Sequence, residues 1–387
     1  MIAEIIFWLS VTAIFHTYVL FPFLLKFLAK GKKENLQIYT PEEDLPLVSV
    51  ILSVHNESGV ILKKLTSIYN TLYPLKKIEV LIGSDASTDK TDLICKIYSE
   101  NYDSFYFFPF TERKGKPEIV NNLVEFSKGE ILIMTDAQAY FDRNTIYEII
   151  KHFRNPAIDI VGGNIINEKV SITGISFQET EYMKREIRMK YLEGLVWGQT
   201  MGVYGAIFAI RKEAFMKVPE NYTVDDFYLT MQVLQKKRKA ILNLKAIVRE
   251  DVPGDLNIEF KRKIRISAGN FQNMNAFRDC LIPPWSSLAF VFFSHKVLRW
   301  TGPLFLLLMF LSNIILAYSS VFFRFLIAIQ TILVILPFID IMLRKLNFHS
   351  IILRFVTHFY AMNIALSIGF FKNLTGKKTN IWQPTRR

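Results

Sequence analysis

Five aspartates in the middle of the chain adjoin apolar runs that have the pattern of buried strands. Asp85 and Asp89 follow IEVLIGS, Asp136 follows EILIMT, and Asp225 and Asp226 stand together in TVDDFYL. In an α/β protein, the carboxyl ends of the sheet strands are where side chains meet a ligand. Carboxylates placed there can hold a metal ion or move a proton.

Asp85 and Asp89 lie in SDASTDKT, where a predicted strand ends and a predicted helix begins. Asp89 and Thr91 are residue types that cap helices, so capping explains Asp89. Capping does not explain Asp85, because its side chain stands at the exit edge of the strand. We therefore expect Asp85 to bind the base or ribose of a nucleotide.

Two pairs of cations could bind phosphate. Arg113 and Lys116 stand around a glycine in TERKGKPEIVNN, at the start of a predicted helix. Backbone N–H groups at a helix N-terminus, together with two cations, suit a diphosphate, and a solvated basic turn is the alternative. Arg262 and Arg265 would lie on one face of a helix in EFKRKIRISAGNFQ, where they could clamp phosphate or contact lipid headgroups.

The remaining three aspartates are candidates for metal binding and proton transfer. Asp136 ends an apolar strand, and a carboxylate there can bind Mg²⁺ or Mn²⁺ that bridges a diphosphate; a helix cap is the alternative. Asp225 and Asp226 precede a predicted helix, FYLTMQVLQKKRKA, whose first turn favours acidic residues. Adjacent carboxylates point in different directions, so we expect one to act as a base and the other to be structural.

The elements that must position these residues alternate between strand and helix. Strands are predicted at LVSVILSV, IEVLIGS, YFFPF and EILIMTD, and the helices between them at residues 58–73, STDKTDLICKIYSE and EIVNNLVEFSK. This alternation predicts an α/β fold with a doubly wound, Rossmann-like nucleotide-binding half and right-handed crossovers. Further on, DIVGGNI and GAIFAIR are predicted strands, the second lining an acceptor cleft, and SFQETEYMKREIRMKYLEG is a predicted amphipathic helix.

The composition is too apolar for an ordinary soluble enzyme. Of 387 residues 51% are hydrophobic, the mean hydropathy is +0.22, and the apolar residues gather at 5–28 and beyond about 285. The net charge is +12, and many of the cations stand beside the apolar stretches without a nucleic-acid-binding motif. This placement predicts membrane lipids as partners and no nucleic acid. Two distant cysteines and six scattered histidines argue against a disulfide framework and a zinc site.

The apolar stretches predict a multi-pass protein of the cell membrane. Residues 5–28 can span a bilayer and lack the basic start and the cleavage site of a signal peptide. Cations follow this stretch, which places the next domain in the cytoplasm. The number of C-terminal crossings stays open. The predicted parts are an N-terminal transmembrane anchor (1–30), a linker (31–46), a cytoplasmic catalytic domain (47–279) with a nucleotide-binding half (47–140) and an acceptor half (141–279), an interfacial helix (280–300), C-terminal membrane helices (301–371) and a basic tail (372–387).

The order of the motifs resembles that of membrane-bound family 2 glycosyltransferases with the GT-A fold, including those that make bacterial cell-surface polysaccharides. In that family a strand ending near Asn-Glu precedes an Asp-rich loop, Arg-x-Gly-Lys, Asp-x-Asp, Glu-Asp and Gln-x-x-Arg-Trp. The positions of this chain that match or follow those motifs are Asn56, Glu57, Asp85, Arg113, Lys116, Asn121, Asp136, Asp225, Asp226, Arg262 and Arg265. TMGVYGAIFAIR, which contains Gly205, is similar to the acceptor-side glycine segment of the family. The resemblance covers nearly the whole chain.

Two positions depart from the family pattern. Gln138 replaces the second Asp of Asp-x-Asp, and because an amide is a weaker metal ligand, the metal would rest on Asp136 and the diphosphate. Arg262 and Ile266 replace the Gln and Trp of the last motif. In the processive polymerases that the chain resembles, that Trp would serve as a stacking platform for the polymer. Its absence here puts processive synthesis in question.

The resemblance implies inverting transfer of a hexosyl or N-acetylhexosaminyl group from a nucleoside-diphosphate sugar, with a UDP-sugar favoured. The acceptor would be a hydroxyl of a membrane-proximal glycan or a lipid-linked molecule, and Asp226 would take its proton. Mg²⁺ or Mn²⁺ at Asp136, with Lys116 and Arg265, would stabilise the leaving diphosphate.

The other matching positions receive binding roles from the resemblance. Asp85, Asn56, Glu57, Arg113 and Asn121 would contact the nucleotide sugar, and Arg262, Gly205 and Asp225 would lie on the diphosphate and acceptor side. Two further functions stay open: transfer of one sugar to polyprenyl phosphate, and a membrane scaffold without catalysis.

Overall fold

The computed structural model describes residues 1–168, 170, 175–251 and 255–376, which form two compact units. The helical unit comprises Met1–Phe27, Val170–Lys184 and Pro253–Lys377, and the sheet unit comprises Leu28–Lys169 and Arg185–Val252. Helix α7 (Ser176–Trp197) begins in the helical unit and ends in the sheet unit. Most of the basic tail predicted at 372–387 lies outside the described residues.

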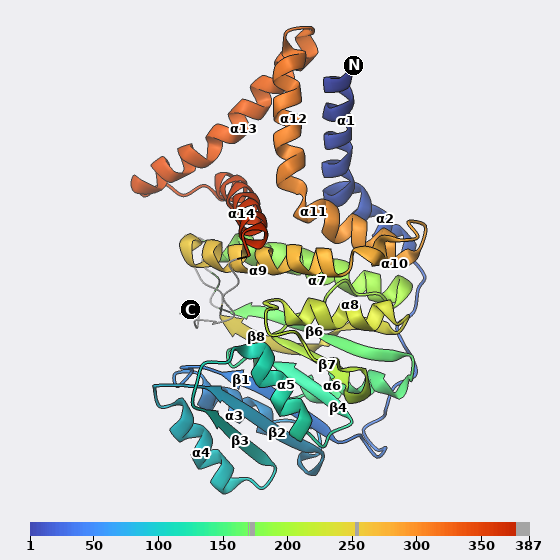
Figure 1. Ribbon diagram of the computed structural model, residues 1–387, viewed down its shortest axis with the longest axis vertical. Helices are drawn as coiled ribbons and strands as arrows, with labels where there is room; N and C mark the ends of the chain where they lie inside the picture. The colour runs from blue at the N-terminus through green and yellow to red at the C-terminus, as the bar shows by residue number, and fades with distance from the viewer. Residues whose placement is uncertain (169, 171–174, 252–254, 377–387) are drawn as a thin grey trace. The chain divides into compact units, whose positions relative to one another are not determined.

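The sheet unit is built on eight strands in the order β3-β2-β1-β4-β7-β6-β8-β5 (Figure 1). The strands β1 (Val48–Val54), β2 (Ile78–Asp85), β3 (Phe105–Phe110) and β4 (Ile131–Thr135) run parallel. β2 and β4 are buried along their whole length, as expected of parallel strands that are covered on both faces. The predicted parallel arrangement of these four strands is confirmed, while nucleotide binding by this half stays a prediction.

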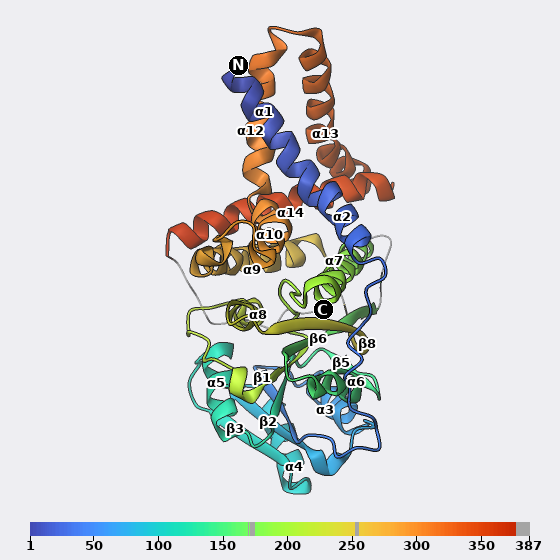
Figure 2. The same cartoon turned by 90° about the vertical axis from the view of Figure 1, so that its right-hand side faces the viewer.

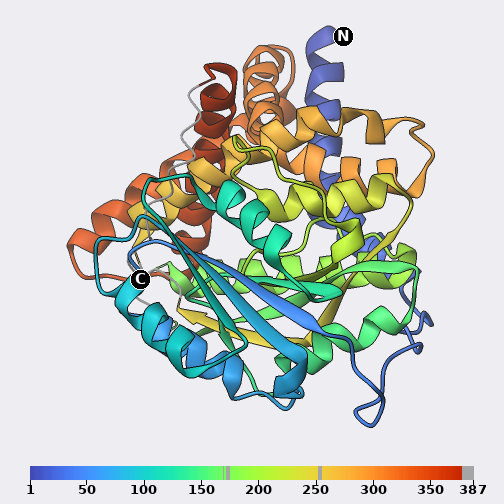
Figure 3. The same cartoon turned by 60° about the horizontal axis from the view of Figure 1, so that its bottom comes forward.

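Helices cover both faces of these strands. Figure 3 shows α5 (Lys116–Phe126) on one face, and α3 (Ile61–Tyr69) and α4 (Thr91–Asn101) on the other. A Cβ built on Gly83 of β2 would clash with Ile119 Cγ2 of α5, so only glycine allows this close approach. The chain passes from β1 to β2 and β3 on one side and returns to β4 on the other. The order in which strands are added therefore reverses between β1 and β4. Open α/β sheets bind ligands at the carboxyl ends of the strands beside such a reversal.

The other half of the sheet is mixed. β7 (Ile207–Arg211) runs antiparallel to β4 and to β6 (Ile158–Glu168), whereas β8 (Lys239–Asp251) runs parallel to β6. β6 and β7 confirm the strands predicted at DIVGGNI and GAIFAIR. β5 (Tyr140–Phe141), α6 (Thr145–Ile150) and α8 (Asp225–Gln235) also belong to the sheet unit.

The expectation that KKRKA continues the helix after Asp226 was wrong. α8 ends at Gln235, and Lys237 takes a left-handed conformation with φ 60. β8 then starts at Lys239 and alternates between buried and more exposed residues along much of its length. Alternation with a period of two is typical of a strand, and it outweighs the helix propensity of the lysines and arginine before it.

The predicted linker at 31–46 has no helix or strand, but it packs on the sheet unit. The Tyr39 N–H donates to the Lys151 carbonyl at 2.9 Å, and the Tyr147 hydroxyl donates to the Tyr39 carbonyl at 2.9 Å. Asn155 Nδ2 donates to Asn35 Oδ1 at 3.0 Å. These hydrogen bonds hold the segment against the sheet unit.

The helical unit contains the apolar helices predicted at both chain ends. Among the described residues, Ile2–Leu28, Val321–Lys345 (α13) and Ile351–Leu374 (α14) are long and apolar enough to cross a membrane. Ser287–Trp300 and Gly302–Ala317 (α12) pass the same test as a pair, but they are bent by 62°. By length and composition, the described residues thus contain three helices that could cross a membrane, or four if the bent pair counts as one span.

The helices of this unit run in two directions. α1 (Ile2–Phe15) and α12 lie side by side, whereas α14 runs crosswise to them and packs on α9 (Leu256–Ala276), as Figure 2 shows. The N-terminal stretch continues through a π turn into α2 (Phe21–Leu28), and the interfacial segment predicted at 280–300 contains the short helices α10 (Ser287–Val291) and α11 (Leu298–Trp300).

Buried ion pairs connect α7, α9, α13 and α14 within the helical unit. Glu179 lies 2.7 Å from Lys263 Nζ and 3.2 Å from His358 Nε2. Asp340 lies 3.2 Å from Arg354 Nε, and both side chains are almost fully buried. Pairing is what allows these charges to stay in an apolar unit, because an isolated buried charge is costly.

Candidate active site

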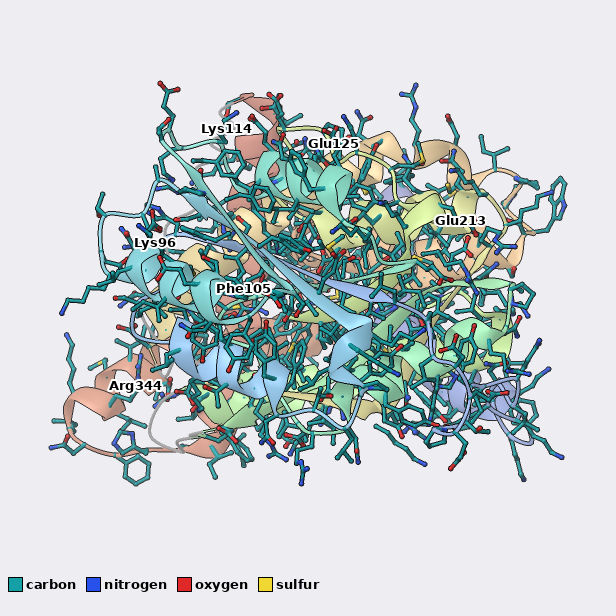
Figure 4. All side chains as sticks on the ribbon, turned by 90° about the horizontal axis from the view of Figure 1, so that it is seen from below. Lys96, Phe105, Lys114, Glu125, Glu213 and Arg344 are labelled. Atoms are coloured by element: carbon teal, nitrogen blue, oxygen red, sulfur yellow. The ribbon has the colours of Figure 1, made fainter. Side chains whose placement is uncertain are left out.

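The predicted site residues of the sheet unit gather at the carboxyl ends of β1, β2 and β4. Figure 4 labels Phe105 at the start of β3 and Lys114 beyond the carboxyl end of β3, so Lys114 marks this edge of the sheet. Three loops meet at this edge: residues 55–60 after β1, 86–90 after β2 and 111–115 before α5. The carboxyl ends of β1 and β4, between which the strand order reverses, lie at the same edge.

Asp85 organises the loop that carries Arg113. Its carboxylate accepts hydrogen bonds from Arg113 Nε at 3.1 Å, from the Lys114 N–H at 2.6 Å and from the Gly115 N–H at 3.1 Å. Asp85 is only 4% exposed, so these bonds replace water around the charge. The structure therefore gives Asp85 a loop-ordering task, while its contact with a nucleotide base stays a prediction.

His55 is a member of this group that the sequence did not reveal. Its Nδ1 lies 2.8 Å from the Asp85 carbonyl oxygen, and its Nε2 lies 2.8 Å from Arg113 Nη1. The two distances fit a ring that donates from Nδ1 and accepts at Nε2 from the guanidinium. His55 thus holds Arg113 from the β1 side, as Asp85 does from the β2 side.

The loops after β1 and β2 are bonded to each other. The Thr88 N–H donates to Asn56 Oδ1 at 2.8 Å, and the Ser58 N–H donates to Asp89 Oδ2 at 3.0 Å. Although burial opposes it, the hydrogen bonds from Ser58 and Thr91 lower the pKa of Asp89 to about 2. Asp89 is therefore a structural acid, in agreement with the capping interpretation.

Lys116 forms ion pairs with two of the carboxylates of the site. It opens α5 directly after Gly115, whose φ of 85 suits glycine, and its Nζ lies 3.0 Å from Asp136 Oδ1 and 3.6 Å from Asp225 Oδ2. Burial alone would lower the pKa of Lys116, but Asp136 and Asp225 outweigh it and raise that pKa above its ordinary value. The side chain is therefore an ammonium ion throughout the neutral range.

Gly205 is the point where the site residues converge. Its N–H donates to Asp226 Oδ2 at 2.8 Å. A Cβ added to Gly205 would stand 3.5 Å from Lys116 Nζ, 3.6 Å from Asp226 Oδ2 and 3.9 Å from Asp136 Oδ2. Glycine thus leaves room for a ligand atom between two carboxylates and an ammonium group.

The pKa of Asp226 lies in the range that suits a general base. Burial and the neighbouring Asp225 raise the pKa of Asp226 to about 6, despite the opposing effect of Lys190 and Lys116. At neutral pH the carboxylate is mostly ionised, yet it is basic enough to take a proton from a hydroxyl as that hydroxyl attacks. Asp225, at the first position of α8, pairs with Lys116 instead, which gives the two acids different tasks.

The residues present fit a metal ion only when a diphosphate shares it. The side chain of Asp136 is 49% exposed, so its carboxylate is open to a ligand. Gln138 Nε2 donates to Glu57 Oε2 at 3.2 Å, so the amide that replaces the second acid is bonded to a buried carboxylate. The described part of the chain contains no group of three His, Cys, Asp or Glu side chains placed to hold a metal. One carboxylate plus substrate phosphates is, however, a common environment for Mg²⁺.

Asn121 bonds the backbone of the sheet unit, and Arg262 and Arg265 belong to the helical unit. Asn121 Nδ2 donates to the Val218 carbonyl at 2.8 Å and its Oδ1 accepts from the Val218 N–H at 3.0 Å, so its amide ties α5 to the segment after β7. Arg262 lies in α9 of the helical unit, where it bonds Glu259 at 3.1 Å, and Arg265 lies in the same helix. The roles of these residues toward a diphosphate or nucleotide stay predictions.

Lys64 is a second residue that the sequence did not single out. It is fully buried in α3, beneath the turn that carries Asp136. The available signal was its position, because Ile61, Lys64, Leu65 and Ile68 share the buried face of the helix at i, i+3, i+4 and i+7. A lysine on that face must find partners inside the protein.

Comparison with known proteins finds similarity to glycosyltransferases. Residues 49–218 match the family model described as Glycosyl transferase family 2. The chain is 26% identical over 244 residues to the probable glycosyltransferase YdaM of Bacillus subtilis, covering 59% of this chain and 56% of that protein. It is 29% identical over 155 residues to a poly-beta-1,6-N-acetyl-D-glucosamine synthase of Staphylococcus epidermidis, covering 40% of this chain and 37% of that protein. The chain thus spans about half the length, or less, of these relatives.

A solved structure shows the same fold. A mannosyltransferase from Pyrobaculum calidifontis, determined in complex with GDP-Man and Mn²⁺, superimposes with a TM-score of 0.75 and 22% sequence identity, covering 97% of this chain and 100% of that one. The expected GT-A fold is therefore confirmed. Residues 49–218, which include Gly205 and most of the site residues of the sheet unit, are therefore similar to the glycosyl transferase family 2.

Proposed function

We propose that this protein transfers a sugar, with inversion, from a nucleoside-diphosphate sugar to a hydroxyl of a membrane-proximal glycan or lipid-linked acceptor. The observation that carries the proposal is the arrangement around Gly205, where Lys116, Asp136 and Asp226 all lie within 4 Å of one point. A cation for the diphosphate, a carboxylate for a metal and a base for the acceptor are thus in reach of one reacting centre.

The donor would lie across the N-terminus of α5. The backbone N–H groups there and the ammonium of Lys116 favour a diphosphate, and Arg113, held by Asp85 and His55, would face the nucleotide side. Asp136 would hold Mg²⁺ or Mn²⁺ jointly with the donor, and the metal would neutralise charge on the leaving diphosphate.

Asp226 would act on the acceptor. Its Oδ2 is oriented by the Gly205 N–H, and its Oδ1 accepts from the Phe227 N–H at 2.7 Å, so the carboxylate is fixed by two backbone donors. A carboxylate with a pKa of about 6 can remove the hydroxyl proton as the oxygen attacks the anomeric carbon. Attack from the face opposite the leaving diphosphate inverts the configuration at that carbon.

The proposed place of action is the cell membrane, with the sheet unit in the cytoplasm. The support is the set of apolar helices in the described part of the chain that are long enough to span a bilayer, and the lysines that follow the first of them. A cytoplasmic sheet unit would have direct access to nucleotide sugars. Membrane lipids would then be permanent neighbours of the helical unit.

The test is a donor screen with the full-length protein in detergent. UDP-glucose, UDP-N-acetylglucosamine and GDP-mannose are each supplied with Mn²⁺, and release of the nucleoside diphosphate and thermal stabilisation are measured. We expect one donor to be hydrolysed slowly without an acceptor and to raise the melting temperature. Stabilisation without any turnover, with glycan or polyprenyl-phosphate acceptors added, would support a scaffold instead, and the absence of both would overturn the proposal.

A further inference from the structure

Lys64 has no task in the mechanism above, although its environment is unusual for a lysine. The side chain is completely buried in α3, on the same face as Ile61, Leu65 and Ile68. Burying a lysine side chain is costly unless its amino group is hydrogen-bonded. The partners that it finds therefore show what the lysine holds in place.

The amino group of Lys64 bonds both ends of the turn that carries Asp136 and Gln138. Nζ donates to Thr135 Oγ1 at 2.7 Å, just before Asp136, and to the Ala139 carbonyl, just after Gln138. The ring of Phe141 lies 3.7 Å from the same nitrogen and closes the third side. A five-residue turn is thus clamped at its two ends by one side chain.

Hydrogen bonds connect Thr135 further to the segment that contains Gly205. The Thr135 hydroxyl, which accepts from Lys64, donates to the Ala206 carbonyl at 2.7 Å. The preceding residue is Gly205, whose N–H donates to Asp226 at 2.8 Å. One chain of hydrogen bonds therefore leads from Lys64 through Thr135 to the segment that orients the base.

From these contacts we infer that Lys64 is a positioning residue of the donor site, which fixes the Asp136 turn directly and the Gly205 segment through Thr135. This inference rests on the proposed function, because it assigns Lys64 to the same donor site. The residue also explains how a turn with one acid in place of two keeps its shape, since the tether comes from the protein core and needs no ion.

Lys64 can donate its hydrogen bonds whether its amino group is charged or neutral. Burial drives the pKa of Lys64 well below its ordinary value, and Asp136 opposes that effect. An uncharged amine would still bond Thr135 or Ala139. A glutamine at this position, which keeps two N–H donors without charge, can therefore distinguish tethering from electrostatics.

The experiment compares full-length Lys64→Met, Lys64→Gln and Thr135→Val with the wild type. Binding of UDP and of GDP, each with Mn²⁺, is measured by titration calorimetry, and thermal unfolding reports folding. Lys63→Met is the matched control, because Lys63 is the exposed neighbour on the same helix, over the ring of Tyr140.

We expect Lys64→Met to weaken nucleotide binding about tenfold, as the loss of a buried hydrogen-bonded anchor would do, and Lys64→Gln to recover at least part of it. Thr135→Val should weaken it in the same direction, and combining it with Lys64→Met should add little. Lys63→Met should bind like the wild type. Recovery by glutamine distinguishes positioning from a general loss of packing.

The outcomes separate this inference from the proposed function. A wild type that binds neither UDP nor GDP overturns both. A wild type that binds, with a folded Lys64→Met that binds equally well, overturns the role of Lys64 alone. If Lys64→Met does not fold, Thr135→Val decides, because valine matches threonine in shape: unchanged binding by that variant overturns the inference.

Discussion

Replacing Gly205 with alanine tests the geometry of the site with a single added methyl group. The backbone of Gly205 is outside the left-handed region, and the nearest atoms to an added Cβ are Lys116 Nζ at 3.5 Å and Asp226 Oδ2 at 3.6 Å, which are ordinary contact distances. Alanine should therefore fold without strain, with a free energy of unfolding equal to that of the wild type or up to about 1 kcal/mol higher.

The effect on catalysis should be much larger than the effect on folding. The methyl group would occupy the point where a donor or acceptor oxygen would contact Lys116 and Asp226. Losing one charge-assisted hydrogen bond costs about 1.5–3 kcal/mol, so kcat/KM for sugar transfer should fall roughly 10- to 150-fold. A coupled assay of nucleoside diphosphate release measures kcat/KM, and thermal unfolding measures stability on the same preparation.

Gly59→Ala is the matched control for this substitution. Gly59 is also outside the left-handed region, and a Cβ there would meet nothing within 4 Å, so the same chemical change enters open space. Its kcat/KM should equal that of the wild type. The reasoning is refuted if Gly205→Ala keeps wild-type kcat/KM while remaining folded, because a ligand then does not approach Lys116 and Asp226 through that point.

Three further predictions follow from the charges of the site. Because Asp226 must be ionised to accept a proton and its pKa is raised to about 6, kcat/KM should rise with pH through that value and be about tenfold lower at pH 5 than at pH 7; a flat profile from pH 5 to 7 would contradict its role as base. Asp136→Asn should shift the Mn²⁺ concentration for half-maximal turnover upward at least about tenfold, because it removes the one exposed carboxylate of the turn; an unchanged metal titration would remove Asp136 from the metal site. Gln138→Asp would place a carboxylate beside Glu57 in place of a donor, so the variant should lose about 1–2 kcal/mol of stability without metal and regain it with Mn²⁺; an equal effect of Mn²⁺ on the melting temperatures of variant and wild type would show that position 138 does not face the ion.

The strands of the parallel half of the sheet could be predicted because buried strands need apolar residues, which are visible in the sequence. β1, β2 and β4 are covered on both faces, so their residues form mostly apolar runs that end at or next to the candidate site positions. β8 carries no such run. Its residues alternate, and the cations before it, KKRK, favour a helix when they are considered alone, so the strand was missed.

The site residues could be predicted by type but not by partner. Asp85 and Asp136 both follow a buried strand, yet Asp85 accepts three hydrogen bonds from one loop, while the Asp136 side chain is half exposed. Only the fold decides which aspartate faces the protein and which faces a ligand. Lys64 and His55 were missed for the same reason, because each acts through residues that are distant in sequence.

Asp226→Asn is the measurement that tests the central claim most directly. Asparagine keeps the shape of the side chain and removes its ability to take a proton. Sugar transfer and nucleoside diphosphate binding should be measured on the same preparation of the full-length protein. We predict that kcat falls by about 10²–10⁴, as expected for loss of a general base, while the dissociation constant of UDP or GDP with Mn²⁺ changes less than about threefold. Equal loss of transfer and binding, or transfer at the wild-type rate, would contradict the assignment of Asp226 as the base at the Gly205 site.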